Sequence, residues 1–322
     1  MKFDYREQVL GYSILRKTDI EALHEATLNL MEDYGVCVFG EEAQEILAGA
    51  GCKIDKVTSK IKFPRNLVND CIISSPEEMI LYARDPAKNV KIGGDAVTFT
   101  TFGTGVAIID PYTGERRDTT LKDVGDIARL ADAVDEVDTV TIPVAAMDVT
   151  MEIKELYEGE ALLNNTSKNI GHDCDGGKNT RAFLRMAAAV AGGADKLREK
   201  PIVTLGSCPN SPLEIHENAG EQIIEAARAG IPMDILSMGL AGGSTPVTLA
   251  GTLLTTNCEI LAGIVLGQSV SKGAPMIYGS STTIMDLKLT TSPVGAPEHA
   301  MVGAAVAAIG KYYGIPTDVG GT

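Results

Sequence analysis

Two patterns of apolar and polar residues divide the chain near residue 96. In residues 18–34 apolar side chains recur every three or four positions, which predicts a helix. Further helices are predicted over 41–51 and 64–74, with a short extended piece between them. Because strands and helices do not alternate in this region, we interpret residues 1–95 as an N-terminal helical cap.

After residue 96, apolar β-branched runs alternate with helical stretches, which is typical of parallel strands joined by helices. The intervening helices are expected to begin near Lys122, Glu152, Lys178, Glu214, Pro246 and Pro297. Six strands are predicted over 97–102, 139–144, 169–174, 202–207, 233–238 and 275–280, and a seventh begins at Ile315.

Seven such units come close to a closed eight-stranded barrel. The alternative is an open doubly wound sheet, but the chain has no GxGxxG turn and no P-loop. Glycine and hydroxyl residues also follow several strands rather than one, as barrel active sites require. We therefore predict an α/β fold, a (β/α)8 TIM-type barrel over residues 96–322. It is expected to be truncated after its seventh strand, with the C-terminal part missing, because the sequence ends on a glycine-rich strand end.

The charge balance narrows the choice of partners. The chain of 322 residues has 43 acidic and 28 basic side chains and a net charge of −15. This acidity argues against nucleic acid and anionic membranes, and fits a cytoplasmic enzyme or one that handles a cation. Six scattered cysteines lack metal-ligand spacing, so no metal site is expected. The most apolar run, residues 247–267, contains Thr, Asn and Glu, which favours a buried helix over a membrane span.

Candidate chemistry lies at the predicted strand ends, where a barrel places its active site. His172 is either an acid/base group in the barrel mouth or a hydrogen-bonded structural residue. Glu214 is expected to open a helix, either as a favourable charge in its first turn or as a carboxylate at the cavity rim. Tyr278 presents an aromatic face to a quaternary ammonium ion or packs in the core, and for Phe102 we favour core packing. His299 is interpreted mainly as a cap and solvent residue.

Longer motifs surround these positions and point to a family. Together they resemble the trimethylamine:corrinoid methyltransferases, a likeness that runs from about residue 18 to the end of the chain. The block over residues 236–281 carries the most specific part of it. The matching segments are 102–105, 209–214, 236–238, 242–254, 278–281, 293–298 and 313–322.

The resemblance implies a barrel longer than this chain. In the family's trimethylamine-using members, the segment that resembles residues 313–322 is followed at once by pyrrolysine, encoded by an in-frame amber codon. The resemblance therefore implies pyrrolysine after Thr322 and an inactive chain without it. Members without pyrrolysine, which use quaternary amines such as glycine betaine, are the alternative. A non-catalytic barrel that binds small amines is the alternative from another class.

The resemblance also implies a reaction and its participants. A methyl group would pass from trimethylamine to the Co(I) corrinoid of a cognate partner protein, in methylamine metabolism of the methanogenic type, and no cofactor would be bound within the chain. Glu214 and His172 would take the catalytic proton or hydrogen-bond role. The chain is expected to form a homo-oligomer. Substrate-binding positions implied by the resemblance are Tyr278, Ser280, Ser281, Phe102, Gly320 and Gly321, the two glycines giving room for residue 323.

Overall fold

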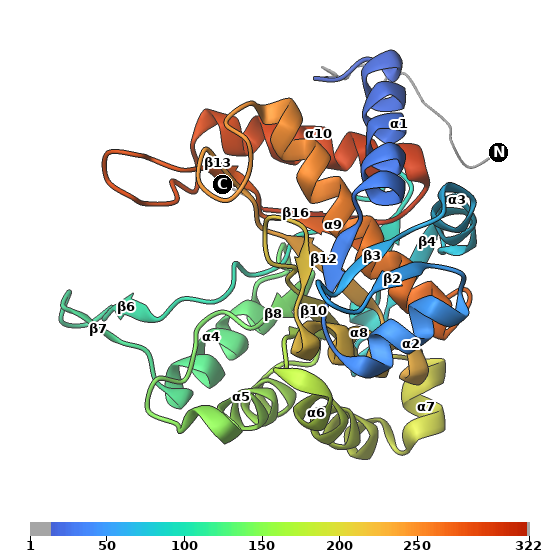
Figure 1. Cartoon of the computed structure of the whole chain (residues 1–322). Helices are drawn as coiled ribbons and strands as arrows, with labels where there is room; N and C mark the ends of the chain where they lie inside the picture. The colour runs from blue at the N-terminus through green and yellow to red at the C-terminus, as the bar shows by residue number, and fades with distance from the viewer. Residues whose placement is uncertain (1–13, 321–322) are drawn as a thin grey trace.

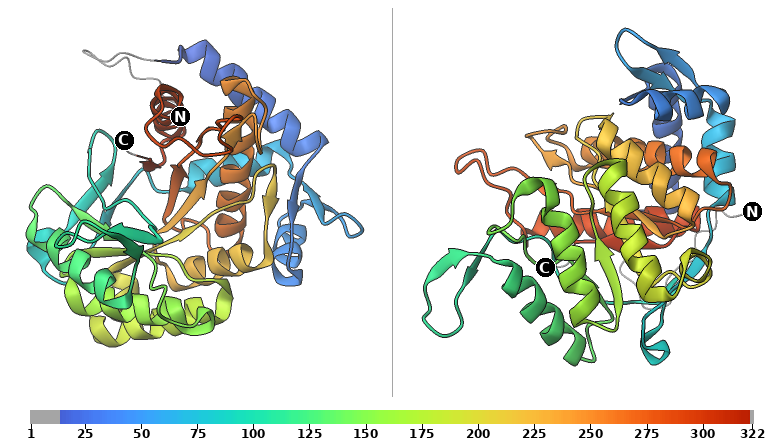
Figure 2. Two further views of the ribbon diagram at one scale, coloured as in Figure 1. Left: turned by 90° about the vertical axis from the view of Figure 1, so that its left-hand side faces the viewer. Right: turned by 90° about the horizontal axis from the view of Figure 1, so that it is seen from below.

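The computed structural model describes residues 14–320 and is built around a parallel sheet of six strands. The order is β16-β14-β12-β10-β9-β8, so strands that follow one another along the main path of the chain lie side by side. The sheet curls, with helices on its outer face (Figures 1 and 2). Its strands are β8 (Thr139–Thr141), β9 (Asn169–His172), β10 (Val203–Ser207), β12 (Met233–Ser237), β14 (Met276–Ser280) and β16 (Thr317–Val319).

Six of the seven predicted strands are confirmed, and the prediction for residues 97–102 is wrong. That segment runs beside β8 but pairs with it only at the isolated bridge between Thr100 and Thr139. Val97, Phe99 and Phe102 are all more than 60% exposed, so no apolar layer covers the segment to hold it as a regular strand. An α/β fold with a parallel sheet is confirmed, whereas the eight-stranded barrel stays a prediction.

The outer layer consists of the helices that connect the strands. Among them α9 is buried along most of its length, although by length and composition it is apolar enough to span a membrane. The prediction of a core helix over this run is therefore confirmed. The helix expected near Glu214 begins instead at Glu217. The helices are α4 (Leu121–Ala133), α5 (Met151–Asn165), α6 (Gly176–Ala191), α7 (Ala194–Glu199), α8 (Glu217–Ala229), α9 (Leu249–Val270) and α10 (Pro297–Tyr313).

Local sequence signals explain where several of these helices begin and end. Thr120 and Asp123 form a reciprocal capping box at the start of α4, which satisfies backbone N–H groups that have no partner in the first turn. Gly192, Gly230 and Gly314 end α6, α8 and α10 in the left-handed conformation, which glycine adopts without steric cost.

The N-terminal region is mixed rather than purely helical, which corrects the prediction of a helical cap. The three expected helices are present as α1 (Lys17–Asp33), α2 (Glu41–Gly49) and α3 (Arg65–Ser74), and α1 and α3 pack against α9. The region also contains β1 (Val36–Val38), β2 (Lys53–Asp55), β3 (Lys60–Lys62), β4 (Glu78–Leu81), the short 3₁₀ helix η1 (Pro86–Lys88) and β5 (Val90–Gly93). A domain boundary near residue 95 stays a prediction.

Short strands complete the fold. β11 (Glu214–Ile215) pairs with β1 and joins the small N-terminal sheet, whose order is β11-β1-β3-β2. β6 (Ala107–Ile109) and β7 (Arg116–Asp118) form a hairpin that projects from the body of the molecule (Figure 1). β13 (Leu240–Ala241) and β15 (Thr283–Ile284) pair beyond the ends of β12 and β14.

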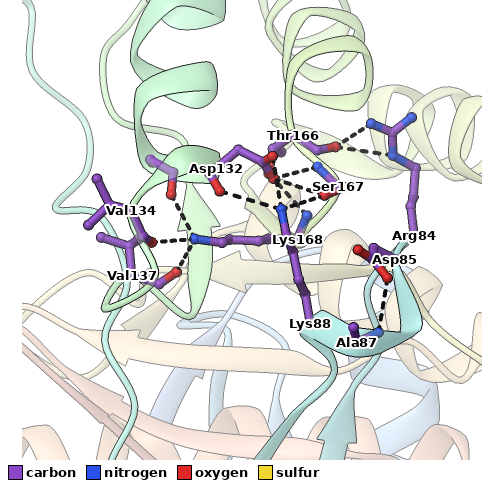
Figure 3. Close-up of polar contacts among 11 residues, drawn as sticks. Arg84, Asp85, Ala87, Lys88, Asp132, Val134, Val137, Thr166, Ser167 and Lys168 are labelled. Atoms are coloured by element: carbon purple, nitrogen blue, oxygen red, sulfur yellow. Dashed lines mark hydrogen bonds and ion pairs between the residues drawn. The ribbon is translucent and has the colours of Figure 1, made fainter.

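A polar cluster ties the N-terminal region to the start of β9 (Figure 3). Lys88 Nζ, at the end of η1, lies 2.9 Å from Asp132 Oδ2 and 2.8 Å from Ser167 Oγ. Asp132 also accepts hydrogen bonds from the hydroxyl of Thr166 and the amide of Ser167. Beside it, the buried Lys168 ammonium donates to three backbone carbonyls at the end of α4 and in the turn that follows. The cluster fixes the strand at the end opposite to the candidate site.

Candidate functional site

The concave face of the sheet carries small and polar residues among apolar ones and borders a cavity of about 1150 Å³. Side chains in a strand alternate between the two faces of the sheet. Ile170, Val203, Ile235 and Tyr278 are buried in the hydrophobic core on the helix side. A barrel interior is normally filled by bulky branched side chains, whereas here small and polar ones leave it open. Residues of this wall include Thr139, Thr141, Asn169, Gly171, Thr204, Gly206, Asp234 and Asp318.

Three aspartates alternate with two glycines across this face, and we call these five residues the acidic row: Asp173, Gly206, Asp234, Gly279 and Asp318. Their neighbourhood follows from the register of the sheet. Gly206 pairs with Asp234, and Gly279 pairs with Asp318. Asp173 directly follows the pairing of His172 with Leu205, which places it beside Gly206. Five positions from five successive strands or strand ends thus form one row.

The glycines are needed because the carboxyl groups lean over the neighbouring strand. A Cβ atom at Gly206 would overlap Asp173 Oδ1, and one at Gly279 would overlap Asp234 Oδ1. Larger residues at these two positions would push both carboxyl groups out of the row. The alternation of aspartate and glycine therefore makes space for acidic groups inside the sheet.

Burial makes it costly to charge the whole row at once. Asp234 is only 7% exposed, and burial, together with the negative charge of Asp318, raises its pKa well above the ordinary range. Burial also raises the pKa of Asp318, although a hydrogen bond from Asp234 opposes the shift. The side chain of Asp173 is accessible from the cavity, but it lies at the cavity floor and is surrounded by protein. This loss of solvation raises its pKa to about 6. The row can therefore hold a proton near neutral pH or attract a cation.

Two predicted site residues, His172 and Tyr278, direct their side chains toward the helices, although His172 also borders the cavity. Their catalytic and substrate-binding roles stay predictions. The imidazole of His172 packs against Phe183, with its Nε2 atom 2.8 Å from the carbonyl oxygen of Glu155, and burial lowers its pKa to about 4. The hydroxyl of Tyr278 donates to Asn257 Oδ1 at 2.7 Å in the core under α9. In both residues the side chain packs on the helix side of the sheet, because successive side chains of a strand point to opposite faces.

Two further predicted positions lie outside the cavity wall. Glu214 does not open a helix: it lies in β11, paired with Cys37, and its Oε1 atom is 2.9 Å from His216 Nε2. Phe102 is 63% exposed, so the expected core packing is wrong as well. Neither side chain lines the cavity in the described part of the chain.

The ends of β14 and β16 do bring predicted residues together. Ser280 is buried and donates to the hydroxyl of Thr282, while its carbonyl accepts from the amide of Gly320 at 3.0 Å. Ser281 lies close to Gly320, because a Cβ on this glycine would be 3.6 Å from the Cα of Ser281. Gly321 lies outside the described residues.

His299 lies beside this strand end and is 2% exposed, so its interpretation as a solvent residue is wrong. The Nδ1 atom lies 3.1 Å from the carbonyl oxygen of Thr282. Its Nε2 atom is buried without a hydrogen-bond partner among the described residues, and a Cβ at Gly320 would come within 2.9 Å of it. The imidazole of His299 therefore lies directly against Gly320, just after β16.

Glu259 is a second group that the sequence did not single out. It is fully buried in α9 and accepts hydrogen bonds from Ser211 Oγ at 2.8 Å, the Leu213 amide at 2.8 Å and Ser237 Oγ at 2.6 Å. Burial raises the pKa of this carboxyl despite the three donors. Its contacts hold the loop after β10 against the end of β12.

Comparison with known proteins places the chain in a family. The model of the trimethylamine methyltransferase family, MTTB, matches residues 4–322. The chain belongs to the trimethylamine methyltransferase family. The chain is 48% identical to trimethylamine methyltransferase MttB of Desulfitobacterium hafniense over 98% of its length, and 40% identical to MttB of Methanosarcina barkeri over 94%. It spans 64% and 62% of the lengths of these two relatives.

More distant comparisons agree with the family assignment. The chain is 32% identical, over 96% of its length, to a glycine betaine methyltransferase of Desulfitobacterium hafniense. It spans 64% of the length of that relative. The solved structure of monomethylamine methyltransferase MtmB from Methanosarcina barkeri superposes with a TM-score of 0.56, covering 93% of this chain and 65% of that one. At 10% identity this likeness shows only that the chain shares the MtmB fold over this region.

Proposed function

We propose that this chain belongs to an enzyme that transfers a methyl group from trimethylamine to the Co(I) corrinoid of a cognate partner protein. The observation that carries the proposal is the 48% identity to a trimethylamine methyltransferase over nearly the whole chain. A cavity walled by carboxyl groups supports it, because an alkyl amine is basic and carries a positive charge when protonated, as a lysine side chain does.

The partner's corrinoid would supply a strong nucleophile that accepts the methyl group. This chain's own contribution would be to admit the amine, hold it and control its proton. The acidic row is placed for that work because it lines the cavity and can exchange a proton near neutral pH. Because His172 and Glu214 have their hydrogen bonds elsewhere, we assign the proton-holding role to the row rather than to them.

We also propose that pyrrolysine follows Thr322 and supplies the electrophile to which the amine is bound. The unpartnered Nε2 atom of His299 beside Gly320 supports this proposal, since a polar group brought in after β16 would give it a hydrogen-bond partner. Reading the gene beyond the codon for Thr322 tests it. An amber codon in a continuing frame is the expected result. A sense codon would favour the glycine betaine type, and an ochre or opal codon with nothing coding beyond would contradict both.

The chemistry of the cavity favours trimethylamine over a quaternary amine. A quaternary ammonium ion is normally recognised by several aromatic faces. Neither Tyr278 nor Phe102 lines the cavity, and within the described chain its wall contains a single aromatic residue, Tyr312. Carboxyl groups instead suit an ammonium ion that still has an N–H bond to donate.

Methyl transfer by the full-length protein is the decisive experiment. Reduced corrinoid protein is mixed with enzyme and either trimethylamine or glycine betaine, and the corrinoid absorption spectrum and released dimethylamine are followed. We expect trimethylamine to methylate the corrinoid and betaine to leave it unchanged. Transfer from betaine alone would support the pyrrolysine-free alternative, whereas amine binding without transfer to any corrinoid would support a binding protein.

The same assay tests the earlier candidates one by one. We expect Glu214→Gln to keep a near-normal rate and Asp234→Asn to lower it sharply, because only Asp234 faces the cavity. The reverse result would restore Glu214 as the catalytic carboxylate. We also propose a cytoplasmic location and a homo-oligomeric state. The location is supported by the six cysteines, which all lie in the described residues and form no disulfide there.

A further inference from the structure

We propose that a buried network of His24, Tyr313 and Asn257, which we call the His24 latch, holds α1 against the body of the molecule only while His24 is unprotonated. Acid would open the latch, release α1 and expose one side of the cavity. The proposal concerns a part of the chain that the proposed function does not use. It follows from the directions of the hydrogen bonds in the network and from the place of α1 beside the cavity.

α1 is attached through one face of the helix. This face combines the apolar side chains of Ile20, Leu28 and Met31 with two buried polar ones, His24 and Thr27. It packs against α9 and α3. Most of the stability of a helix in a protein comes from the packing of such a face, so α1 depends on these contacts to stay helical.

The hydrogen bonds around Asn257 of α9 have fixed directions. The hydroxyl of Thr27 donates its single proton to the carbonyl oxygen of Leu23 at 2.8 Å, so toward Asn257 it can only accept. The side-chain NH₂ of Asn257 therefore faces Thr27 at 2.8 Å, and it also donates to the hydroxyl of Tyr313 at 2.9 Å. The side-chain oxygen of Asn257 accepts from the hydroxyl of Tyr278 at 2.7 Å.

This order of donors and acceptors requires a neutral His24. Because the Tyr313 oxygen accepts from Asn257, its own proton is directed at the Nδ1 atom of His24, 3.1 Å away. A histidine nitrogen accepts a hydrogen bond only when it carries no proton. Protonation of Nδ1 would bring two donors face to face in a buried place, since Tyr313 is 0% exposed and His24 is 7% exposed. The network is therefore incompatible with the imidazolium form.

The surroundings of the ring also disfavour its charged form. Burial is the largest effect and lowers the pKa of His24 below its ordinary value of 6.5. The Glu25 carboxylate on α1 and the Asn69 side chain on α3 favour the protonated ring, whereas the Arg65 guanidinium opposes it. Burial raises the pKa of the remaining ionisable groups on the elements packed around α1, so they stay neutral. These groups are Tyr312, Tyr313 and Cys258.

The lowered pKa gives the direction of the pH dependence. When α1 is released, His24 takes up a proton near pH 6.5, whereas in the docked helix it resists protonation. Its contribution to the docking of α1 is therefore fully present above pH 6.5 and is lost as the pH falls through the lowered value.

Release of α1 would change the wall of the cavity. Tyr312 lines the cavity, and the centroid of its ring is 6.3 Å from that of His24. Ile14, which lies just before α1, lines the cavity as well. The latch is therefore directly behind one side of the cavity, beside α10. Movement of α1 would remove Ile14 from this wall and uncover the ring of Tyr312.

The proposal is tested by hydrogen–deuterium exchange with mass spectrometry on this chain of 322 residues. Protection of α1 is compared with that of α5 at pH 7.5 and pH 5.5, after correction for the intrinsic pH dependence of exchange. The test variant is His24→Asn, because the side-chain oxygen of asparagine can accept from Tyr313 at the position of Nδ1 but does not titrate. The matched control is His216→Asn, the same change at an exposed histidine.

We expect the protection of α1 in the wild type to fall about fivefold or more between pH 7.5 and pH 5.5, while that of α5 changes by less than about twofold. His24→Asn should remove this acid response, and His216→Asn should keep it. Parallel losses in α1 and α5 of the wild type, or an unchanged acid response in His24→Asn, would overturn the proposal. If His24→Asn does not fold, Tyr313→Phe takes its place, because it removes the proton that His24 accepts and should abolish the response in the same way.

Discussion

Replacing Lys168 with methionine tests whether a single buried ammonium holds the end of α4 to the start of β9. Lys168 is 4% exposed, and its Nζ atom lies 2.7 Å from each of the carbonyl oxygens of Ala131 and Val134 and also donates to that of Val137. Methionine has a similar length and an apolar character, so it fills the space without any donor. Figure 3 shows the three carbonyls around the ammonium.

The expected loss follows from those contacts. A hydrogen bond to a charged group contributes about 1.5–3 kcal/mol, so three would amount to roughly 4–9 kcal/mol. The desolvation of the ammonium, which methionine avoids, offsets several kcal/mol of this sum. Two of the carbonyls also keep a weak backbone donor, since the amide of Val134 donates to Ala131 and that of Val137 to Val134. We therefore expect a net loss of about 3 kcal/mol, or roughly 4–5 °C in Tm for a chain of this size.

The assay is urea and thermal unfolding followed by circular dichroism, with Lys178→Met as the control. Lys178 is exposed on α6, so the same chemical change should alter stability there by less than about 0.5 kcal/mol. A Lys168→Met variant that unfolds at the same urea concentration as the wild type would refute the reasoning. Equal losses in both variants would show that the effect comes from lysine composition and not from the buried contacts.

Three further predictions concern the site. Glu259→Gln should lower the free energy of unfolding, measured in urea, by about 1–3 kcal/mol, because the amide NH₂ cannot accept hydrogen bonds from the surrounding donors. An unchanged urea midpoint would show that Glu259 does not hold the loop after β10. Gly279→Ala should lower Tm, because its Cβ would overlap the Asp234 carboxyl. The control Gly49→Ala in α2, where the Cβ meets nothing, should be neutral or raise Tm by up to a few degrees. Similar changes in the Tm of both variants would exclude crowding as the cause. The pKa values of Asp234 and Asp318 in the folded protein lie above the unfolded value of 3.8, so their contribution to stability is fully present below that pH and is lost as the pH rises through the folded values. The urea midpoint of the Asp234→Asn, Asp318→Asn double variant should therefore decline less with rising pH than that of the wild type. Parallel curves for the two proteins would contradict the raised pKa values.

The sequence determined the class of fold because its signals are local. Apolar β-branched runs separated by helical stretches predicted six strands that the structure contains. The motifs over residues 236–281 pointed to the family that the comparisons then established. The strand expected over 97–102 failed because residue type alone does not provide the second apolar layer that a strand needs.

Only the tertiary structure decided which residues face the cavity. Polar or small residues alternate with apolar ones along several strands, but alternation alone does not say which side faces a cavity and which side is covered by helices. His172 and Tyr278 lie one position away from the inner face and therefore point to the helices. The acidic row depends on register between paired strand positions that are 28 to 43 residues apart in the sequence, roughly one βα unit. The lone aspartate inside the apolar run of β12 was the one local hint, and its meaning appears only when the sheet brings Asp173 and Asp318 to either side.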